Sequence, residues 1–448
     1  MRKQLFTAIS GMGVCLLAYL FAFGPSVTTV RAKELVVRVP GDFPTIQAAI
    51  DAVDTTIVRG PNDVVRIRVA PGVYNEHVLV TKSRISIEGK RPEFKFSSTA
   101  GREVLVGGTI IDGAGLAPAD DHVGVNPSLA TSGVVTDVTF ENLGTRNARS
   151  NDANFGVDAG GGTAKRITFR HLMVEFRDDN ALRFARDGSG NLRLFPQDPD
   201  PTGCPNPSGG PLQFDPCSDD SAGFFEAVGV FLFGDVQDSL VEDVVVIGDD
   251  PRGNNALEGT DGTKAGFSAG LFDIGGTRNT FRHNRASKVW RGLQFSGSSD
   301  GLAEENEVSE TRVGITLNGA VRATVSHNSA TMSGNDARPL DYPVPCPNDF
   351  VSGEDRCHAG GGMWVRSPNT TLDSKIEHNK SVDNQGSALL WGTASPPSMA
   401  NLILHNEFGG TCDLRIGSPP SCVTSDAAAT AADPDPGKTN LFDKNKYR

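Results

Sequence analysis

The stretch Gly270–Asn328 decides the fold, because one pattern occurs in it three times. It contains GLFDIGGTRNTFRHN (Gly270–Asn284), GLQFSGSSDGLAEEN (Gly292–Asn306) and GITLNGAVRATVSHN (Gly314–Asn328). The first Gly and the last Asn of the pattern both return every 22 residues. A fixed period of this length, with short β-type runs, is typical of a solenoid whose stacked coils bury a common core.

Each coil is predicted to contain three short strands. In the third copy, Ile315 and Leu317 alternate with Thr316 and Asn318, which is the period-two pattern of a strand with one buried side. A polar turn, a second strand ending at Asn328 and a third apolar run follow. Asn tolerates left-handed backbone and can bond to its own backbone or to an Asn one coil away. The repeated Asn therefore predicts a tight corner between the second and third strands.

These residues resemble the right-handed parallel β-helix (pectate-lyase-like) superfamily, whose Asn ladder lies at that corner. The resemblance implies an all-β fold, a single right-handed parallel β-helix with loop insertions between the third strand of one coil and the first strand of the next. It extends over roughly 36–445. Further ladder positions are then expected at Asn379, Asn406, Asn445 and, 14 residues after Gly229, at Asp243.

The N-terminal residues predict an exported protein. Arg2 and Lys3 precede an apolar run over Ile9–Phe23, and Ala32 ends an acceptable cleavage site, so residues 1–32 are expected to be a signal peptide. A retained membrane anchor is the alternative, although the run is short for a span. Residues 33–448 would then form one secreted or periplasmic domain, monomeric and free of the membrane. Thr45–Val53 is expected to form an amphipathic helix that caps the solenoid.

The charge balance argues against a nucleic-acid partner. The chain has 54 acidic and 42 basic side chains, a net charge of −12. The expected leader carries basic residues and no acidic ones, so the mature chain is more negative still. An acidic polysaccharide would need local Arg residues or a bound cation, and Ca²⁺ is the candidate cofactor.

The cysteines predict three local disulfides. Six remain after the leader, an even number in an exported chain, and zinc is the less favoured alternative because no CxxC spacing occurs. Each pair lies in a Pro-, Gly- or Asp-rich insertion, around 187–226, 335–361 and 409–438, and a further insertion spans 249–268. The expected pairs are Cys204 with Cys217, Cys346 with Cys357, and Cys412 with Cys422.

One acidic pair is a candidate for catalysis. The segment RDDNALRF contains Asp178 and Asp179 and resembles the Asp-Asp segment of polygalacturonase-type hydrolases. That resemblance implies catalytic carboxylates. NALRF (Asn180–Phe184) reads as a strand of the first sheet, which would place Arg183 and Asp158 on neighbouring coils. The remaining hydrolase motifs, and those of pectin methylesterases, pectate lyases and alginate epimerases, are not found in the sequence.

The first strand of each coil supplies candidate substrate-binding residues. Strand alternation points Asp158, Arg183, Phe231, Gln294, Thr316, Trp364, Arg366 and Trp391 outward. Aromatic rings stack on sugars and Arg pairs with carboxylates, so we expect substrate binding at Arg291, Gln294, Trp364, Arg366 and Trp391. Burial of Trp364 or Trp391 beneath the insertions is an equally weighted alternative.

The function predicted from these residues is binding of an acidic polysaccharide, either alone or followed by its cleavage. In a lyase, Arg183 or Arg291 would abstract the proton and Asp178 or Asp179 would hold Ca²⁺. In a hydrolase, the two aspartates would be acid and base. A non-catalytic surface protein is the second hypothesis, and an accessory protein like the β-helix partner of nitrous-oxide reductase is the third. The His residues before the ladder Asn form a row, a poor geometry for a metal site.

Overall fold

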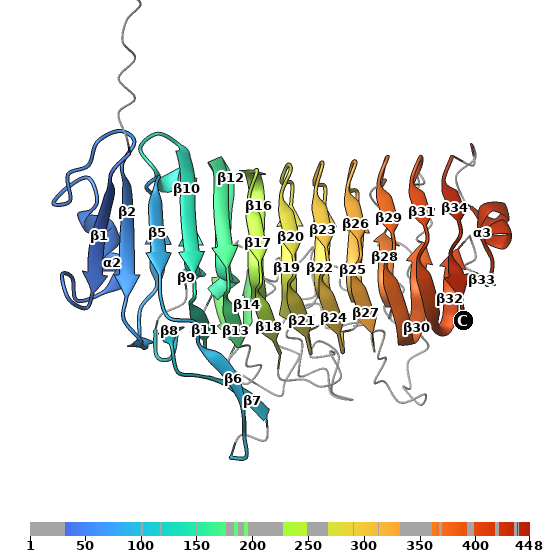
Figure 1. Ribbon diagram of the computed structural model, residues 1–448, viewed down its shortest axis with the longest axis horizontal. Coiled ribbons are helices and arrows are strands. Elements are labelled where there is room, and N and C mark those ends of the chain that lie inside the picture. The colour runs from blue at the N-terminus through green and yellow to red at the C-terminus, as the bar shows by residue number, and fades with distance from the viewer. Residues whose placement is uncertain are drawn as a thin grey trace, which may run out of the picture.

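The fold is seen in a computed structural model. The residues described are 32–99, 102–116, 119–148, 150–175, 183–186, 192–195, 227–248, 268–289, 291–311, 313–331, 361–366, 370–391, 398–416, 421–433, 437 and 439–448. Short strands follow one another around successive coils, and the coils stack along one axis (Figure 1). We number three sheets by the order in which a coil visits them.

The first sheet stacks β4 (Val78–Val80), β9 (Ala119–Val125), the start of β12 (Ser150–Arg170), β16 (Ala227–Gln237), β19 (Ser268–Ile274), β22 (Arg291–Ser296), β25 (Val313–Asn318), β28 (Gly361–Arg366) and the ends of β30 (Lys380–Trp391) and β32 (Glu407–Ile416).

The second sheet stacks β1 (Glu34–Val39), β2 (Val64–Val69), β5 (Ile85–Glu88), β10 (Val134–Glu141), the end of β12, β17 (Leu240–Glu242), β20 (Thr280–Arg282), β23 (Leu302–Glu304), β26 (Thr324–Ser326), β29 (Lys375–Glu377), β31 (Leu402–Leu404) and β34 (Leu441–Asp443).

The third sheet stacks β3 (Gly72–Tyr74), β8 (Thr109–Asp112), β11 (Gly144–Arg146), β13 (Met173–Glu175), β18 (Val245–Ile247), β21 (Arg285–Ser287), β24 (Glu307–Ser309), β27 (Ser329–Thr331), the starts of β30 and β32, and β35 (Lys446–Tyr447). Every pairing within these stacks is parallel, so the predicted parallel β-helix is confirmed.

Two antiparallel hairpins lie outside the stacks. They are β6 (Glu93–Ser97) with β7 (Arg102–Val106), and β14 (Arg183–Arg186) with β15 (Leu192–Phe195). The second hairpin corrects the expectation for NALRF. Arg183 pairs with Phe195 and belongs to no coil. Alternating apolar residues suit a hairpin as well as a coil strand, which explains the error. A single-turn 3-10 helix, η1, spans Pro127–Leu129.

The repeated residues hold neighbouring coils together. Ile315 and Leu317 are 1 % and 2 % exposed, as their alternation predicts. The repeated Gly is required by close packing between sheets: a Cβ on Gly292 would lie 2.0 Å from Cγ1 of Val308 and 2.6 Å from the carbonyl oxygen of Gly314. No larger residue fits there without displacing a neighbour.

The Asn ladder at the second corner is confirmed. In each step, Nδ2 of one Asn donates to Oδ1 of the next at 2.8–3.0 Å, over Asn284, Asn306, Asn328, Asn379, Asn406 and Asn445. One detail differs from expectation. The residue with left-handed backbone is the one before each Asn and not the Asn itself, as at His327 with φ 56°.

The ladder place expected for Asp243 is instead occupied by Val244. Its backbone N–H donates to Oδ1 of Asn284 at 2.9 Å. The prediction failed by one position because the first turn of this coil is one residue longer. Gln237 is in register with Thr277, although Gly234 and Gly275 begin the two turns.

The first corner carries a column of alternating charge. Successive coils place Asp137, Arg166, Asp238, Arg278, Asp300, Arg322 and Asp373 there, all with left-handed φ. Each Arg donates two hydrogen bonds back to the Asp one coil earlier. Arg278 does so to Asp238 at 2.6 and 2.9 Å, and Arg322 to Asp300 at 2.6 and 2.7 Å. The column links coils by bidentate ion pairs.

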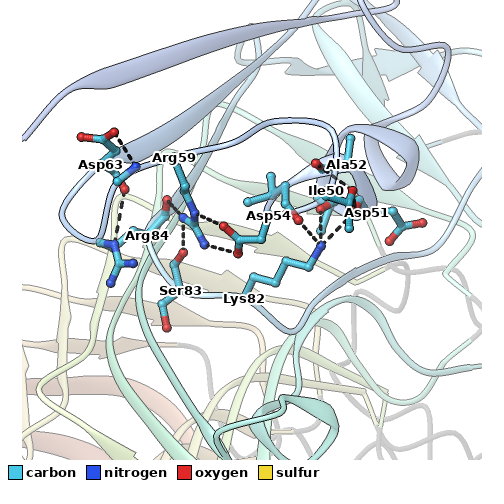
Figure 2. A network of polar contacts seen from close by, with 12 residues as sticks. Ile50, Asp51, Ala52, Asp54, Arg59, Asp63, Lys82, Ser83 and Arg84 are labelled. Carbon is cyan, nitrogen blue, oxygen red and sulfur yellow. Dashed lines mark hydrogen bonds and ion pairs between the residues drawn. The ribbon is translucent and has the colours of Figure 1, made fainter.

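A short helix lies at the N-terminal end of the coils, as predicted. It is α2 (Ile46–Ala52), one side of which is buried against the apolar core (Figure 1). Glu76 accepts hydrogen bonds from the N–H groups of Ile46 and Gln47 at its start. Lys82 donates to carbonyl oxygens at its end, as Figure 2 shows. Both charges suit the helix dipole. That this helix caps the solenoid stays a proposal.

A buried arginine fastens the loop after α2. Arg59 donates to both carboxylate oxygens of Asp54, at 2.7 and 2.8 Å, and to the carbonyl oxygens of Ser83 and Arg84 (Figure 2). Its side chain is 4 % exposed. The network joins the loop to the turn before β5, which fixes the first coils relative to α2.

The C-terminal insertion contains a helix that the sequence did not predict. α3 spans Asp426–Ala432, and the antiparallel strand β33 (Ser421–Val423) precedes it. Asp433, at the end of α3, accepts from Nδ2 of Asn440 with both oxygens at 3.1 Å. α3 lies beside the last coil, at the end of the solenoid (Figure 1).

The three long insertions join the third sheet to the first. They follow β13, β18 and β27 and precede β16, β19 and β28, as predicted. Four of the six cysteines, Cys204, Cys217, Cys346 and Cys357, lie outside the described residues. Cys412 belongs to β32 and Cys422 to β33. The three disulfide pairs stay a prediction.

Candidate functional site

The outward side of the first sheet brings several predicted residues into one row. Strand register aligns Gly156, Phe231, Phe272, Gln294, Thr316 and Trp364 on successive coils. The neighbours of these residues along each strand, such as Leu293 and Ile315, face the core. The predicted outward positions of Phe231, Gln294 and Thr316 therefore agree with the register.

The centre of the row is polar and covered. Gln294 and Arg291 are each 3 % exposed, and Thr316 is 1 % exposed. Arg291 Nη1 donates to Oε1 of Gln294 at 3.3 Å, and its guanidinium lies 5.9 Å from the ring centroid of Phe272. Arg291 and Gln294, two of the residues expected to bind substrate, therefore lie in contact and are both buried. Their role in substrate binding stays a prediction.

The hydroxyl of Thr316 is the group of this cluster that needs an explanation. Its Oγ1 is buried and has no hydrogen-bond partner among the residues that the structure describes. Leaving a buried hydroxyl without a partner costs free energy, so such a group needs an explanation such as a ligand. A sugar hydroxyl is the kind of group that would satisfy it.

Two carboxylates lie at the N-terminal end of the same side. Asp158, half-buried in β12, accepts from Asn126 Nδ2 at 3.4 Å and from the N–H of Gly160 at 3.1 Å. Asp121 comes from β9, one coil earlier. A Cβ on Gly156 would lie 2.1 Å from Oδ1 of Asp121, so this carboxylate stands over Gly156.

The two carboxylates lie on the same side of the first sheet. Asp121 stands over Gly156, and Gly156 and Asp158 are alternate residues of one strand, about 6.6–6.8 Å apart along it. Sequence reasoning missed Asp121, because an irregular register between Ser150 and Ala153 breaks the alternation beside it. The paired glycines Gly124 and Gly156 were the available signal.

Aromatic rings separate the carboxylates from the polar centre. Phe231 and Phe233 have ring centroids 5.6 Å apart. Phe233 is 39 % exposed and stands in register with Asp158 on the next coil. An exposed ring beside a carboxylate is unusual for a structural position and suits contact with a sugar.

The other predicted residues are placed as follows. Asp178 and Asp179 lie outside the described residues, and Arg183 belongs to the β14–β15 hairpin. Trp364 and Arg366 belong to β28, where their backbones are in register with Thr316 and Asn318. Trp391 ends β30, where its backbone is in register with Val365. The substrate-binding roles of these three residues stay a prediction.

A pair of histidines, one buried and one half-buried, lies in the first coils. Nδ1 of His122 is 3.1 Å from Nδ1 of His77, and His122 is fully buried. Burial first, and then the charge of His77, lowers the pKa of His122 to about 4. Within the described ranges there is no group of three or more His, Cys, Asp or Glu residues that could hold a metal ion. The described helices include none long and apolar enough to cross a membrane.

Comparisons with known proteins complete the description. No family model and no curated protein matches the chain. Among solved structures, it is similar to DFA-IIIase from Arthrobacter chlorophenolicus A6 in complex with GF2, at 14% identity over 83% of this chain and 70% of that chain, TM-score 0.42.

It is also similar to the A-module of the mannuronan C-5 epimerase AlgE6 from Azotobacter vinelandii, at 11% identity over 83% of each chain, TM-score 0.39. The Dettilon tailspike protein is a third, at 11% identity over 92% of this chain and 66% of that chain, TM-score 0.43. Likenesses this distant carry no argument about activity. The strand pairing itself identifies the chain as a parallel β-helix protein.

Proposed function

We propose that this protein binds a polysaccharide along the outward side of its first sheet. The observation that carries the proposal is the buried Oγ1 of Thr316, which has no hydrogen-bond partner within the described part of the chain and stands next to Gln294 in the row. Arg291 and Phe272 border the same place. A sugar would satisfy the hydroxyl, and its ring would pack on the aromatic face.

An acidic polysaccharide fits this row better than a neutral one. Arg291 is the cation of the cluster, and guanidinium groups pair with carboxylates through two hydrogen bonds. The chain as a whole is acidic, so such a ligand must be held by local charge or by an added cation. Ca²⁺ is therefore included as a variable in the test.

A second candidate function is hydrolysis by Asp121 and Asp158. Their placement on one side of adjacent coils supports it, since hydrolysis needs a carboxyl acid and a carboxylate base or nucleophile. Lyase chemistry through Arg291 is the third possibility to be tested. We further propose export by residues 1–32 and a mature monomer of one domain, held in part by the three predicted disulfides.

The test is a panel of polyuronates and neutral glycans, incubated with residues 33–448 with and without Ca²⁺. New ultraviolet absorbance from unsaturated ends would identify a lyase, and new reducing ends without it would identify a hydrolase. Binding with neither signal would mean a non-catalytic protein.

Variants assign the activity to residues. Asp158→Asn and Asp121→Asn should abolish hydrolysis and leave binding, whereas Gln294→Leu should weaken binding. Asp443→Asn, on the second sheet, is the matched control. No binding to any glycan, or full binding by Gln294→Leu, would refute the proposal.

A further inference from the structure

A column of exposed residues runs along the corner between the second and third sheets. Its members are the left-handed residues that precede the ladder positions. In the middle coils, histidine and acidic members of this column contact one another in pairs. His171 Nε2 lies 3.2 Å from Oδ2 of Asp243, and His283 Nε2 lies 2.7 Å from Oε2 of Glu305.

The last coils break this alternation. The column there reads His327, His378, His405 and Lys444, with no acidic member. The three imidazoles stack face to face: the ring centroids are 5.1 and 4.9 Å apart, and the planes of each pair meet at 2°. All three side chains are exposed. We call these three residues the histidine strip.

The acidic groups beside the histidine strip already have partners. Glu377, 3.6 Å from Nδ1 of His378, pairs with Lys375 at 2.6 Å. Asp443 lies 3.9 Å from Lys444, and Glu407 pairs with Arg448. On the far side of His327, Glu305 bonds His283.

Basic residues match the acidic ones around the strip in number. Lys380 and Lys446 follow the ladder Asn of their coils and add two exposed cations. Asp426 of α3 is turned to Asn445 and Tyr447. These paired charges leave the three imidazoles as the groups whose protonation would make the strip positive.

We propose that the histidine strip is a proton-gated binding surface for a linear anionic polysaccharide. Histidine is the side chain whose charge ordinarily changes between pH 5 and 8. Stacked imidazolium groups repel one another, and a polyanion laid along them removes that repulsion. Binding and proton uptake must then strengthen each other.

The geometry favours a polymer over a metal ion or a small anion. Two nitrogens on one zinc ion lie within about 4.2 Å of each other, since each bond is about 2.1 Å. Parallel rings 4.9–5.1 Å apart form a row instead of a chelate. A chain with regularly spaced carboxylates meets several imidazoles at once, and linked contacts multiply affinity.

This surface is independent of the function proposed above. The strip lies at the corner between the second and third sheets, across the coil from the first sheet. Changes in Gln294 or Thr316 should therefore leave binding at the strip intact, and the two binding proposals can be tested separately.

The experiment measures polygalacturonate binding to the whole mature chain at pH 7.5 and pH 5.5, at fixed ionic strength. We expect at least tenfold tighter binding at pH 5.5, and weaker binding as salt rises. The variant with His327→Gln, His378→Gln and His405→Gln should lose this gain. His283→Gln is the matched control, because it occupies the same corner but pairs with Glu305; it should keep the gain.

Several outcomes would overturn the proposal. The unfolding midpoint of the triple variant is compared with wild type to establish that it folds, and the single variant His378→Gln should lose part of the gain. A pH-dependent gain that survives in the folded triple variant contradicts the proposal. Equal binding of neutral dextran contradicts it too. Histidine-dependent binding to phosphatidylserine vesicles without binding to polygalacturonate would assign the strip to a membrane surface instead.

Discussion

Asp426 receives both donors that Asn445 presents at the end of the ladder. Nδ2 of Asn445 donates to Oδ1 of Asp426 at 2.8 Å, and its backbone N–H donates to Oδ2 at 3.2 Å. Inside the ladder the next Asn does this: the N–H and Nδ2 of Asn306 both donate to Oδ1 of Asn328. The carboxylate of Asp426, at the start of α3, therefore accepts the two hydrogen bonds that the next Asn accepts elsewhere in the ladder. In this way α3 terminates the ladder.

Replacing Asp426 by Ala should destabilise the C-terminal coils. The change leaves two donors of Asn445 without their acceptor, and each such loss costs about 1–3 kcal/mol. The measurement is the free energy of unfolding in urea, together with amide exchange in β31 and β34. Asp443→Ala is the control, since Asp443 is exposed and lies 3.9 Å from Lys444. Equal stability of the two variants would contradict the role assigned to α3.

Asp273 should make stability fall as pH rises. Its carboxyl is fully buried in β19, and burial raises the pKa to about 7, although hydrogen bonds from Asn279 and Gly276 oppose that rise. A raised pKa means that the stabilisation is complete below the unfolded value and is lost as pH rises through the folded one. Unfolding free energy should therefore drop between about pH 4 and 7, by up to about 1.4 kcal/mol per pH unit.

The variant Asp273→Asn tests this assignment, because its amide does not ionise. Relative to wild type, it should gain stability steadily from about pH 4 to pH 7 in urea unfolding and gain no more above that range. The comparison uses the difference between the two proteins, so other titrating groups cancel. A difference that stays constant across this range would show that Asp273 does not ionise with the expected pKa.

The repeat made most of the fold predictable from sequence. Gly and Asn at fixed intervals report close packing and a hydrogen-bonded corner, and Gly292 and Asn306 have those roles. Local departures from the repeat were harder to predict from sequence. Val244 took the place expected for Asp243 because one turn is longer, and no local pattern records turn length. Asp121 was not predicted as a site residue, because the irregular register beside it breaks the alternation that would have shown which side of the sheet it faces.

The candidate site was only partly predictable for a related reason. Alternation placed Gln294 and Thr316 outward correctly, since they lie in regular strands. It could not say that they would be covered, which depends on segments far along the chain.

Reversing one charge in the first corner should destabilise several coils. Arg166→Asp removes the two hydrogen bonds to Asp137, at 2.6 and 2.8 Å, and places a new carboxylate between Asp137 and Asp238. Exposed pairs contribute about 0.2–1 kcal/mol each, and close like charges in water repel by about 1 kcal/mol. We expect a loss of roughly 2 kcal/mol, reduced in 0.5 M salt. The measurement is urea unfolding at low and high salt.

The neutral variant Arg166→Met separates repulsion from lost pairing. It should cost less than Arg166→Asp and respond less to salt. The ion pair between Arg166 and Asp137 also predicts that stability falls in acid. Hydrogen bonding from Arg166 lowers the pKa of Asp137, so this stabilisation is present above the ordinary value and lost as pH falls below about 4. If both variants lose the same stability at every salt concentration, the alternating charge has no part in it.

Thr316→Val should stabilise the protein while weakening glycan binding. Valine keeps the shape of threonine and removes a buried hydroxyl that has no partner, so the free energy of unfolding should rise by about 1 kcal/mol. The same change removes the group that we propose to meet a sugar hydroxyl, so affinity for the best glycan of the panel should fall about fivefold to tenfold. Urea unfolding and calorimetric titration measure the two effects.

The control for this prediction is Thr324→Val, a half-buried threonine of the second sheet in the same coil. It should change neither quantity by much, because it lies away from the first sheet. The opposite signs at Thr316 are the decisive feature, since a residue with a purely structural role would not lose binding when stability rises. Unchanged affinity in a stabilised Thr316→Val would mean that the hydroxyl faces no ligand, and the polysaccharide site would have to be sought elsewhere on the coil.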